Sequence, residues 1–454
     1  MPHSSIVHDL RSAHSADALL TGVPLPTLLY FALPIILGNI FQQLYSIVDA
    51  IVVGNFLGDL PLSGISVASP IVDVANALVI GGTIGVGVLC AHYCGAGEGE
   101  RLCCMNATAL LGGGALTLLI ALCGIFFSTP LLRAQGTEEA VCREAAVYLQ
   151  LVFAGLLFCF LYNYYAAMLR SCGNSRTPFL ILLLSSTLHA LLDVLFVGVF
   201  GWGIRGVAFS TVLCQALAAA ACILYAQRRC PPLLLRPANL RFDRQMARLV
   251  LSYAWAAALQ QAVVCIGRLL VQGMLTPLGT STVTGYNMSL RTEQFLFCFS
   301  QGISAAMVVC LSQNLGHGDR PRARRFFRIS VLVELALIAL LGTVCFLFPA
   351  RIVGLFSDNA DVIAAGAQYT GAMAYLYVFA YLGEVIQGFF RGLGRLRLTM
   401  VASLLQVLLR VVLSYLLIPV WGMYGICAAV VSGWVLLAGI EGAYAVRKSS
   451  ALAA

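Results

Sequence analysis

Charged side chains are scarce in this sequence. Of its 454 residues only 10% are Asp, Glu, Lys or Arg, whereas a soluble domain carries about 25%. Hydrophobic residues make up 60% of the chain, and the mean hydropathy is +0.91. This is too little charge to cover a surface that faces water. A soluble globular protein is therefore excluded, and most of the surface must face lipid.

Several functional motifs are also absent. There is no Walker sequence, so ATP cannot drive a process from within this chain. Neither an HExxH motif nor a Ser/His/Asp pattern supports an enzyme, and no filter-like sequence supports a channel. The sixteen cysteines include no CxxC pair, so the spacing of zinc ligands is missing. Because most of them lie in apolar runs, we interpret them as small apolar helix residues. We expect no enzymatic activity, no cofactor and no metal site at the cysteines.

Long apolar runs occupy most of the sequence. A transmembrane helix needs about 20 mainly apolar residues. Runs of this kind predict twelve helices, near 27–53, 66–92, 105–127, 144–168, 178–197, 206–226, 249–275, 284–313, 327–348, 363–388, 398–418 and 422–445. The expected fold class is an all-α polytopic membrane protein.

The distribution of basic residues predicts the orientation. Twelve spans place both termini on one side of the membrane, where 20 Lys and Arg residues lie, against four on the opposite side and three inside spans. By the positive-inside rule both termini are expected in the cytoplasm, with the chain in the inner or plasma membrane. The net charge of +8 is thus a topology signal and does not indicate a nucleic-acid partner. The polar segment 1–26 lacks the basic and apolar regions of a cleavable signal, so the first span is expected to be retained.

The sequence repeats itself at about half its length. The segment Gly97-Glu98-Gly99-Glu100-Arg101 resembles Gly316-His317-Gly318-Asp319-Arg320, and Trp202-Gly203 resembles Trp421-Gly422 at the same offset. Six spans per half give parallel repeats related by a pseudo-two-fold axis along the membrane normal. The predicted parts are a cytoplasmic tail at 1–26, an N-lobe of helices 1–6 at 27–226, a cytoplasmic linker at 227–248, a C-lobe of helices 7–12 at 249–445 and a cytoplasmic tail at 446–454.

Ionisable residues within the spans are functional candidates because burying them in a membrane is costly. The first half has Asp49, Asp73 and Asp193, with His189 one helical turn before Asp193 and no Lys or Arg in these spans. By helical rise, Asp49, Asp193 and the Thr211 hydroxyl all fall in the outer half of the membrane. Carboxylate and hydroxyl oxygens suit Na⁺, whereas adjacent carboxylates suit H⁺. Hydrogen bonding between helices is the alternative role, and for His189 simple packing.

The second half carries both signs of charge within its spans. Its members are Glu293, Glu334, Glu384, Arg268, Arg291 and Arg410. We expect these acids and bases to form ion pairs, or else to line a polar substrate surface. The asymmetry between the halves predicts that the first half holds the cation site.

Pro34 lies inside the first span, well before Asp49. A proline in a helix interior removes one backbone hydrogen bond and produces a kink. Asp49 is therefore expected on a helix that can bend, with a static kink as the alternative.

Taken together, the sequence resembles the multidrug and toxic compound extrusion (MATE) family, in its bacterial DinF-like branch. The resemblance extends from residue 24 to residue 447. It is carried by Leu33-Pro34…Val48-Asp49…Val53-Gly54, Gly95-Ala96-Gly97, Leu169-Arg170-Ser171-Cys172-Gly173-Asn174-Ser175-Arg176-Thr177-Pro178 and Gln313-Asn314-Leu315-Gly316. It implies a twelve-helix exporter of cationic or amphipathic compounds, driven by inward Na⁺ or H⁺.

The resemblance also implies which residues couple the ion. Asp49, Asp193 and Thr211 match the DinF-like coupling residues, and Asn163 matches a further family Asn by spacing. Pro34 matches the family's bending proline.

The sequence departs from the family at two positions. His189 stands where the family has an Asn, which places a titratable ring at the site and favours H⁺. Gln260 or Gln261 stands where the NorM branch has an acid in its seventh span, so a cation site of the NorM type in the C-lobe is not expected.

The sequence thus predicts a secondary active multidrug efflux antiporter that works by rocker-switch alternating access. Its expected partners are small organic, mainly cationic substrates and the lipid bilayer, and it is expected to be a monomer. A related alternative is a flippase for lipid-linked saccharides, in which the three arginines would line an open cavity. Alternatives of a different class are a channel or an intramembrane enzyme.

Overall fold

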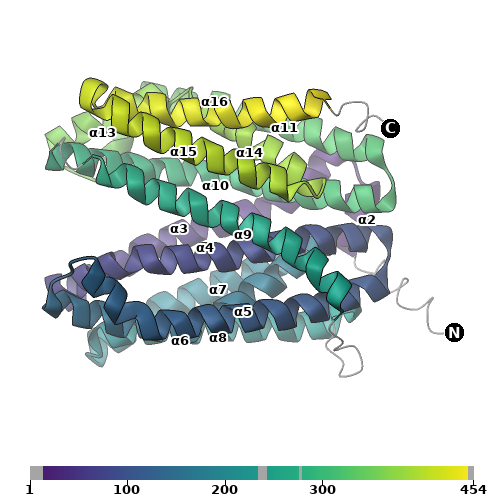
Figure 1. Cartoon of the computed structure of the whole chain (residues 1–454), viewed down its shortest axis with the longest axis horizontal. Coiled ribbons are helices and arrows are strands. Elements are labelled where there is room, and N and C mark those ends of the chain that lie inside the picture. The colour runs from purple at the N-terminus through teal and green to yellow at the C-terminus, as the bar shows by residue number, and fades with distance from the viewer. Residues whose placement is uncertain (1–13, 234–242, 276–278, 448–454) are drawn as a thin grey trace. The chain divides into compact units, whose positions relative to one another are not determined.

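The computed structural model describes residues 14–233, 243–275 and 279–447. Parts of the predicted tails and linker lie outside these residues. The helices of the first half are α2 (His14–Thr21), α3 (Pro24–Leu57), α4 (Asp59–Ala96), α5 (Gly99–Ala134), α6 (Glu139–Ser171), α7 (Arg176–Asp193), the π-helix η1 (Val194–Val199), α8 (Gly203–Arg229) and the 3₁₀-helix η2 (Pro231–Leu233) (Figure 1). Those of the second half are α9 (Arg244–Gly273), α10 (Thr280–His317), α11 (Arg320–Leu347), α12 (Pro349–Val353), α13 (Ala360–Met373), α14 (Tyr377–Gly392), α15 (Leu396–Trp421) and α16 (Met423–Arg447).

All twelve predicted spans have counterparts in this set of helices. Eleven helices are long and apolar enough to cross a membrane, and α13 with α14 forms a bent pair that counts as a twelfth span. The predicted all-α polytopic fold is therefore confirmed. Most observed helices extend a few residues beyond the predicted runs, because polar residues at the ends continue the helix past the apolar segment.

The tenth predicted helix, 363–388, is wrong as a single straight helix. It is broken into α13 and α14, which are bent by 57°. At the break the Val378 N–H donates to the Tyr375 carbonyl at 3.1 Å instead of to the residue four positions back. The Ala374 carbonyl comes so near Gly342 of α11 that a Cβ there would lie 2.8 Å from it. Tight turns and this close approach account for the bend. Neither requires a glycine or a proline at the break itself, so the sequence does not indicate the break.

Glycines with positive φ end helices at matching places in the two halves. Gly97 (φ 70°) follows α4 as Gly318 (φ 89°) follows α10, two residues beyond the Gly316 with which the sequence repeat aligns it, and Gly173 (φ 91°) corresponds to Gly394 (φ 74°). A residue with a Cβ is strained in this left-handed region, whereas glycine is not. The repeat seen in the sequence is thus also a repeat of turn geometry.

The helices cluster into two compact units. One contains 14–22, Leu33–Ala262 and Ser312–Asp319, and the other contains Val23–Ala32, Val263–Leu311 and the described residues from Arg320 onward. We call them the first unit and the second unit. The boundary crosses α3 directly before Pro34, which lies inside this continuous helix. The lobe and linker boundaries drawn from the sequence stay predictions.

In the first unit, α6 packs closely against both α4 and α8 because small residues lie at the crossings. A Cβ on Gly64 of α4 would meet the Ala145 backbone at 3.1 Å, and Gly155 of α6 faces Val212 of α8. Tyr164 of α6 is fully buried and donates to Asn106 Oδ1 at 2.8 Å. Such close packing by small residues replaces the hydrophobic driving force that is absent in lipid.

The helix α3 runs alongside α7 and η1 in the first unit. Phe41 and Phe179 have ring centroids 6.2 Å apart, and further along the same direction Phe56 lies against Gly198. Asp49 falls between these two contacts, so its position on α3 is at about the level of the C-terminal end of α7. The Asp49 side chain lies outside the described residues.

In the second unit, buried tyrosines form the centre of the core. Tyr286, Tyr369, Tyr377 and Tyr381 are each at most 1% exposed. The helices α10 and α13 approach at Gly285, where a Cβ would lie 2.8 Å from the Gly366 nitrogen. A buried tyrosine normally needs a partner for its hydroxyl, and for two of them this partner is an acid described below.

Candidate functional site

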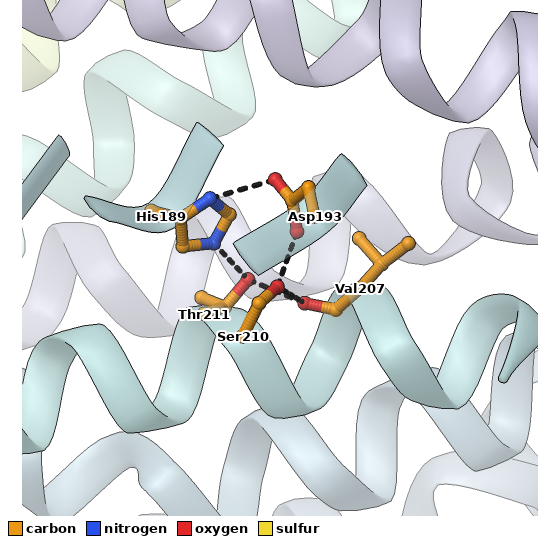
Figure 2. Close-up of polar contacts among 5 residues, drawn as sticks. All are labelled: His189, Asp193, Val207, Ser210 and Thr211. Atoms are coloured by element: carbon orange, nitrogen blue, oxygen red, sulfur yellow. Dashed lines mark hydrogen bonds and ion pairs between the residues drawn. The ribbon is translucent and has the colours of Figure 1, made fainter. Parts of the chain in front are cut away.

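The C-terminal end of α7 and the N-terminal part of α8 bring together the polar residues predicted in this half. His189 and Asp193 are one turn apart on α7 and therefore share a face, and Thr211 faces them from α8 (Figure 2). Asp193 is the last residue of α7, and the π-helix η1 begins directly after it. Short π-helical segments within helices occur frequently at functional sites.

Four side chains form a chain of polar contacts. His189 Nδ1 lies 2.7 Å from Asp193 Oδ2, and His189 Nε2 lies 2.9 Å from Thr211 Oγ1. Ser210 donates a hydrogen bond to the other carboxylate oxygen of Asp193. Figure 2 shows the imidazole ring lying between the carboxylate and the Thr211 hydroxyl. We call His189, Asp193, Ser210 and Thr211 the N-lobe polar cluster.

Three of the four residues of the cluster are almost completely buried, and Thr211 is partly buried. His189 is 3% exposed, Asp193 1% and Ser210 0%. A buried charge is tolerated only when it is paired and hydrogen-bonded. These contacts supply the pairing, because each carboxylate oxygen and each ring nitrogen has a polar neighbour within the cluster.

The Thr211 hydroxyl can form its hydrogen bond with the His189 ring in either direction. Thr211 Oγ1 lies 2.9 Å from the Val207 carbonyl as well as from His189 Nε2, and it has a single hydrogen to donate. When both ring nitrogens carry hydrogens, the ring is paired with Asp193 through Nδ1 and donates to Thr211 through Nε2, and Thr211 donates to Val207. When Nε2 loses its hydrogen, Thr211 can donate to the ring instead. The two arrangements differ by one proton and need no movement of heavy atoms.

Ser210 was missed by reasoning from the sequence. Its hydroxyl also lies 2.8 Å from the Val207 carbonyl, the usual local contact of a serine in a helix, so nothing distinguishes it by type. The one available signal was its position next to Thr211.

Asn163 makes its described hydrogen bonds along its own helix. Its Nδ2 donates to the Cys159 carbonyl at 2.9 Å, one turn earlier on α6, and to the Cys159 sulfur at 3.4 Å. Cys159 Sγ in turn lies 3.6 Å from Asn76 Oδ1 on α4. These contacts do not include the N-lobe polar cluster, so a coupling role for Asn163 stays a prediction. Asp73 lies on α4 with an exposed side chain.

In the second unit Glu293 is the buried acid of a tyrosine-lined site. It is 8% exposed, and its Oε2 accepts from Tyr369 at 3.4 Å and from Tyr377 at 3.3 Å. Arg410 of α15 interacts with Tyr286 and with Glu293. The tyrosines were not predicted as part of this site, because a buried tyrosine in a span looks like ordinary packing.

The ion pairs expected among the second-half charges are not found. Within the described residues no ion pair joins Arg268, Arg291 or Arg410 to Glu293, Glu334 or Glu384. Glu384 instead pairs with Arg391 at 2.5 Å, a residue that sequence reasoning had assigned to a loop. Arg268 and Arg291 are exposed on their helices, and Glu334 is fully buried.

Comparison with known proteins places these features in a family. A family model described as MatE matches the chain twice, at residues 34–195 and 256–416. The two matches are of nearly equal length and fall one in each half, which agrees with the repeat in the sequence and in the turn glycines. A probable multidrug resistance protein of Bacillus subtilis, YpnP, is 27% identical over 387 residues, which cover 85% of this chain and 86% of that protein.

Two further similarities extend the comparison. A FAD transporter of Shewanella oneidensis is 26% identical over 346 residues, covering 74% of this chain and 75% of that protein. The solved structure of a transporter of the MOP superfamily from Pyrococcus furiosus superposes with a TM-score of 0.89 at 19% identity, covering 96% of this chain and 98% of that one. This last likeness shows the fold. Since the two matches of the family model span more than half of the sequence, the chain belongs to the MatE family, the multidrug and toxic compound extrusion transporters.

Proposed function

We propose that the protein is a secondary active exporter of cationic or amphipathic organic compounds, driven by inward movement of H⁺. The observation that carries this proposal is the buried N-lobe polar cluster, whose hydrogen bonds accommodate one proton more or one fewer. The name of the relative YpnP, a probable multidrug resistance protein, supports the substrate class. The bias of Lys and Arg supports an orientation with both termini in the cytoplasm.

The contacts within the cluster favour H⁺ over Na⁺ as the coupling ion. Asp193 Oδ2 faces the His189 ring, and its other oxygen accepts from Ser210. A hard cation such as Na⁺ needs several oxygen ligands, so it would have to displace the imidazole from Asp193. A proton needs no such rearrangement, and histidine is the residue type that most readily exchanges a proton under physiological conditions.

Loss of the proton changes the net charge of the cluster. The loaded cluster is neutral overall, as an imidazolium beside a carboxylate. The unloaded cluster has a net negative charge in a nearly water-free environment, which is costly. It is therefore stabilised by either a proton or a cationic substrate nearby, and competition between the two makes transport an exchange. Bending of α3 at Pro34, together with rocking of the two halves, would then release the substrate outward.

An anionic substrate is the second candidate. Arg268 and Arg291 have exposed side chains without an ion pair to the second-half acids named above, and such arginines suit phosphate-bearing compounds. The relative from Shewanella oneidensis is named a FAD transporter. Under this candidate the protein would export a nucleotide-like compound, and the exchange described above for a cationic substrate would not apply.

Transport assays in proteoliposomes test both candidates. Ethidium and FAD would each be followed under an imposed pH gradient and, separately, under an imposed Na⁺ gradient. We expect ethidium transport with the pH gradient alone, and its loss in Asp193→Asn. The matched control is Asp358→Asn, which changes an exposed acid in the loop before α13 and should transport normally.

The outcomes separate the candidates. Transport of FAD but not of ethidium would replace the cationic substrate class by the anionic one. Transport that requires Na⁺ would overturn H⁺ coupling. Normal activity of Asp193→Asn under the pH gradient would remove the cluster from the mechanism altogether.

A further inference from the structure

Three cysteines converge at the ends of α4 and α6. Cys90 and Cys94 are one turn apart on α4, and Cys172 directly follows α6. Their Sγ atoms all lie within 4.8 Å of one another, and those of Cys94 and Cys172 are 3.2 Å apart. The interpretation of the cysteines as isolated apolar residues is incomplete for these three. The i, i+4 spacing on α4 was the only sequence signal, because the third member comes from the end of a different helix.

The backbone holds these sulfurs in place. Ser171 donates to the Gly87 carbonyl at 2.8 Å, which fixes the crossing of α4 and α6 one turn from Cys90. A Cβ on Gly87 would lie 3.3 Å from Ser171 Oγ, so the helices are close only because of this glycine. Cys90 itself is completely buried. The three thiols are therefore preorganised and do not depend on a mobile loop.

The spacing of the sulfur atoms suits a metal ion. A Zn–S bond of about 2.3 Å places the sulfurs of a three-thiolate site about 4.0 Å apart. The observed range, from 3.2 Å to at most 4.8 Å, brackets this distance, so small side-chain rotations would complete the site. Thiolates select soft ions such as Cu(I) and borderline ions such as Zn(II), and no carboxylate belongs to the group.

We propose that Cys90, Cys94 and Cys172 bind one thiophilic metal ion, such as Cu(I) or Zn(II). The bound ion would join the end of α4 to the end of α6. The proposal is independent of the transport proposal, because the sulfur cluster shares no residue with the N-lobe polar cluster.

Cys230 is close to the cluster but is not counted as a ligand. Its thiol interacts electrostatically with Cys172, but its sulfur is not among the three that lie within 4.8 Å of one another. It therefore provides a matched control.

A disulfide between Cys94 and Cys172 is the competing explanation for their short separation. It would use two of the three sulfurs and leave Cys90 without a role. The predicted orientation also places this end of α4 in the cytoplasm, where thiols are kept reduced.

Metal titration of the purified, reduced full chain in detergent tests the proposal. Cu(I) would be titrated under anaerobic conditions against a chromogenic chelator, and Zn(II) against a zinc indicator. We expect one tightly bound ion per chain for at least one of the two metals. Cys90→Ser, Cys94→Ser and Cys172→Ser should each weaken binding by more than the roughly 10–100-fold that loss of an outer-shell partner costs. Cys230→Ser and Cys123→Ser should bind as the unchanged protein does.

Two results would overturn the proposal. The first is equal binding by the unchanged protein and by a variant with all three cysteines replaced by serine. The second is a Cys94–Cys172 disulfide, found by mass spectrometry in protein prepared without reductant, together with no binding after reduction. Proteins with each cysteine replaced by alanine, checked for normal elution and for transport, separate loss of the site from loss of the fold.

Discussion

Thr211 Oγ1 lies 2.9 Å from His189 Nε2 and 2.9 Å from the Val207 carbonyl, so its one hydrogen has two competing acceptors. The hydroxyl thereby responds to the protonation of the imidazole: it accepts from a protonated Nε2 and can donate to an unprotonated one. A methyl group in place of the hydroxyl could neither donate nor accept this hydrogen bond. The structure thus assigns Thr211 a contact in both proton states of the N-lobe polar cluster.

Thr211→Val is expected to impair proton-driven transport, whereas Thr211→Ser should preserve it. Valine has nearly the shape of threonine but leaves Nε2 without a partner, and an unsatisfied buried polar group costs about 1–3 kcal/mol. The penalty is larger for the imidazolium, so the loaded state should bind its proton roughly tenfold or more weakly. The measurement is the rate of ethidium transport as a function of the size of the pH gradient.

Ser185→Ala serves as the control for Thr211. Ser185 also lies on α7 and donates to a backbone carbonyl, that of Cys214, at 3.1 Å, and this hydrogen bond does not include the His189 ring. It should transport like the unchanged protein. Equal rates for Thr211→Val and Thr211→Ser would show that the hydroxyl takes no part in proton binding.

His189→Asn should change the ion preference of the protein. An asparagine replaces the titratable ring by an amide oxygen, which can bind a cation but cannot carry the proton. Together with Asp193 and Thr211 it would restore the oxygen-rich pattern that the family resemblance implies. We expect at least a tenfold loss of transport driven by the pH gradient, accompanied by a gain of stimulation by Na⁺.

The parallel measurement with His92→Asn controls for a general effect of losing a histidine. His92 is exposed on α4 and lies outside the cluster, so its replacement should leave ion dependence unchanged. If His189→Asn still responds to the pH gradient with the original rate, Asp193 alone accounts for proton binding.

Much of the architecture could be predicted because lipid imposes a simple rule. Backbone polar groups must be satisfied within each span, so every long apolar run became helical, and one of them is broken into the pair α13 and α14. The break near Ala374 escaped prediction because it depends on a close approach to Gly342 of another helix. His189 and Asp193 were predictable because their spacing of four residues places them on one face. Ser210 depended on the rotation of α8 against α7, which no local pattern reveals.

Charge pairing in the second half also depends on contacts between side chains that the sequence alone does not reveal. The three span arginines were expected to balance the acids, since composition reports which charges share a segment. Composition does not show which of these charged side chains are in contact. Glu384 reaches Arg391, two turns along α14, and Glu293 is satisfied by the hydroxyls of Tyr369 and Tyr377.

The Glu384–Arg391 pair is expected to stabilise the fold of α14. The two side chains are 25% and 13% exposed, so the pair is only partly screened by solvent. Glu384→Gln removes the negative charge that Arg391 pairs with and should cost roughly 1–3 kcal/mol of stability. The exchanged variant Glu384→Arg with Arg391→Glu should recover part of this loss. The check is thermal unfolding in detergent for Glu384→Gln and for the exchanged protein.

Transport by the same variants shows whether Glu384 also contacts the substrate. A purely structural pair predicts that the exchanged protein transports ethidium and FAD at rates in line with its recovered stability. A recovery of stability without a recovery of transport would place Glu384 in the substrate path, as the sequence alone allowed.

The glycine-rich stretch Gly81–Gly87 offers a matched test of close helix packing. A Cβ on Gly81 would lie 2.6 Å from the Ala257 carbonyl of α9, whereas a Cβ on Gly82 would meet nothing within 4 Å. Gly81→Ala forces side chain against backbone and should cost about 1–3 kcal/mol, the usual range for overpacking. Gly82→Ala should be neutral or slightly stabilising, since alanine is the better helix former.

Thermal unfolding of Gly81→Ala and Gly82→Ala side by side is the decisive comparison. The two changes are identical in chemistry and adjacent in sequence, so any difference between them reports the approach of α9 and not helix propensity. A lower melting temperature for Gly81→Ala alone would confirm that this segment serves packing. Equal melting temperatures would mean that α4 and α9 separate at little cost at this point, so that the contact is one the transporter can break during its cycle.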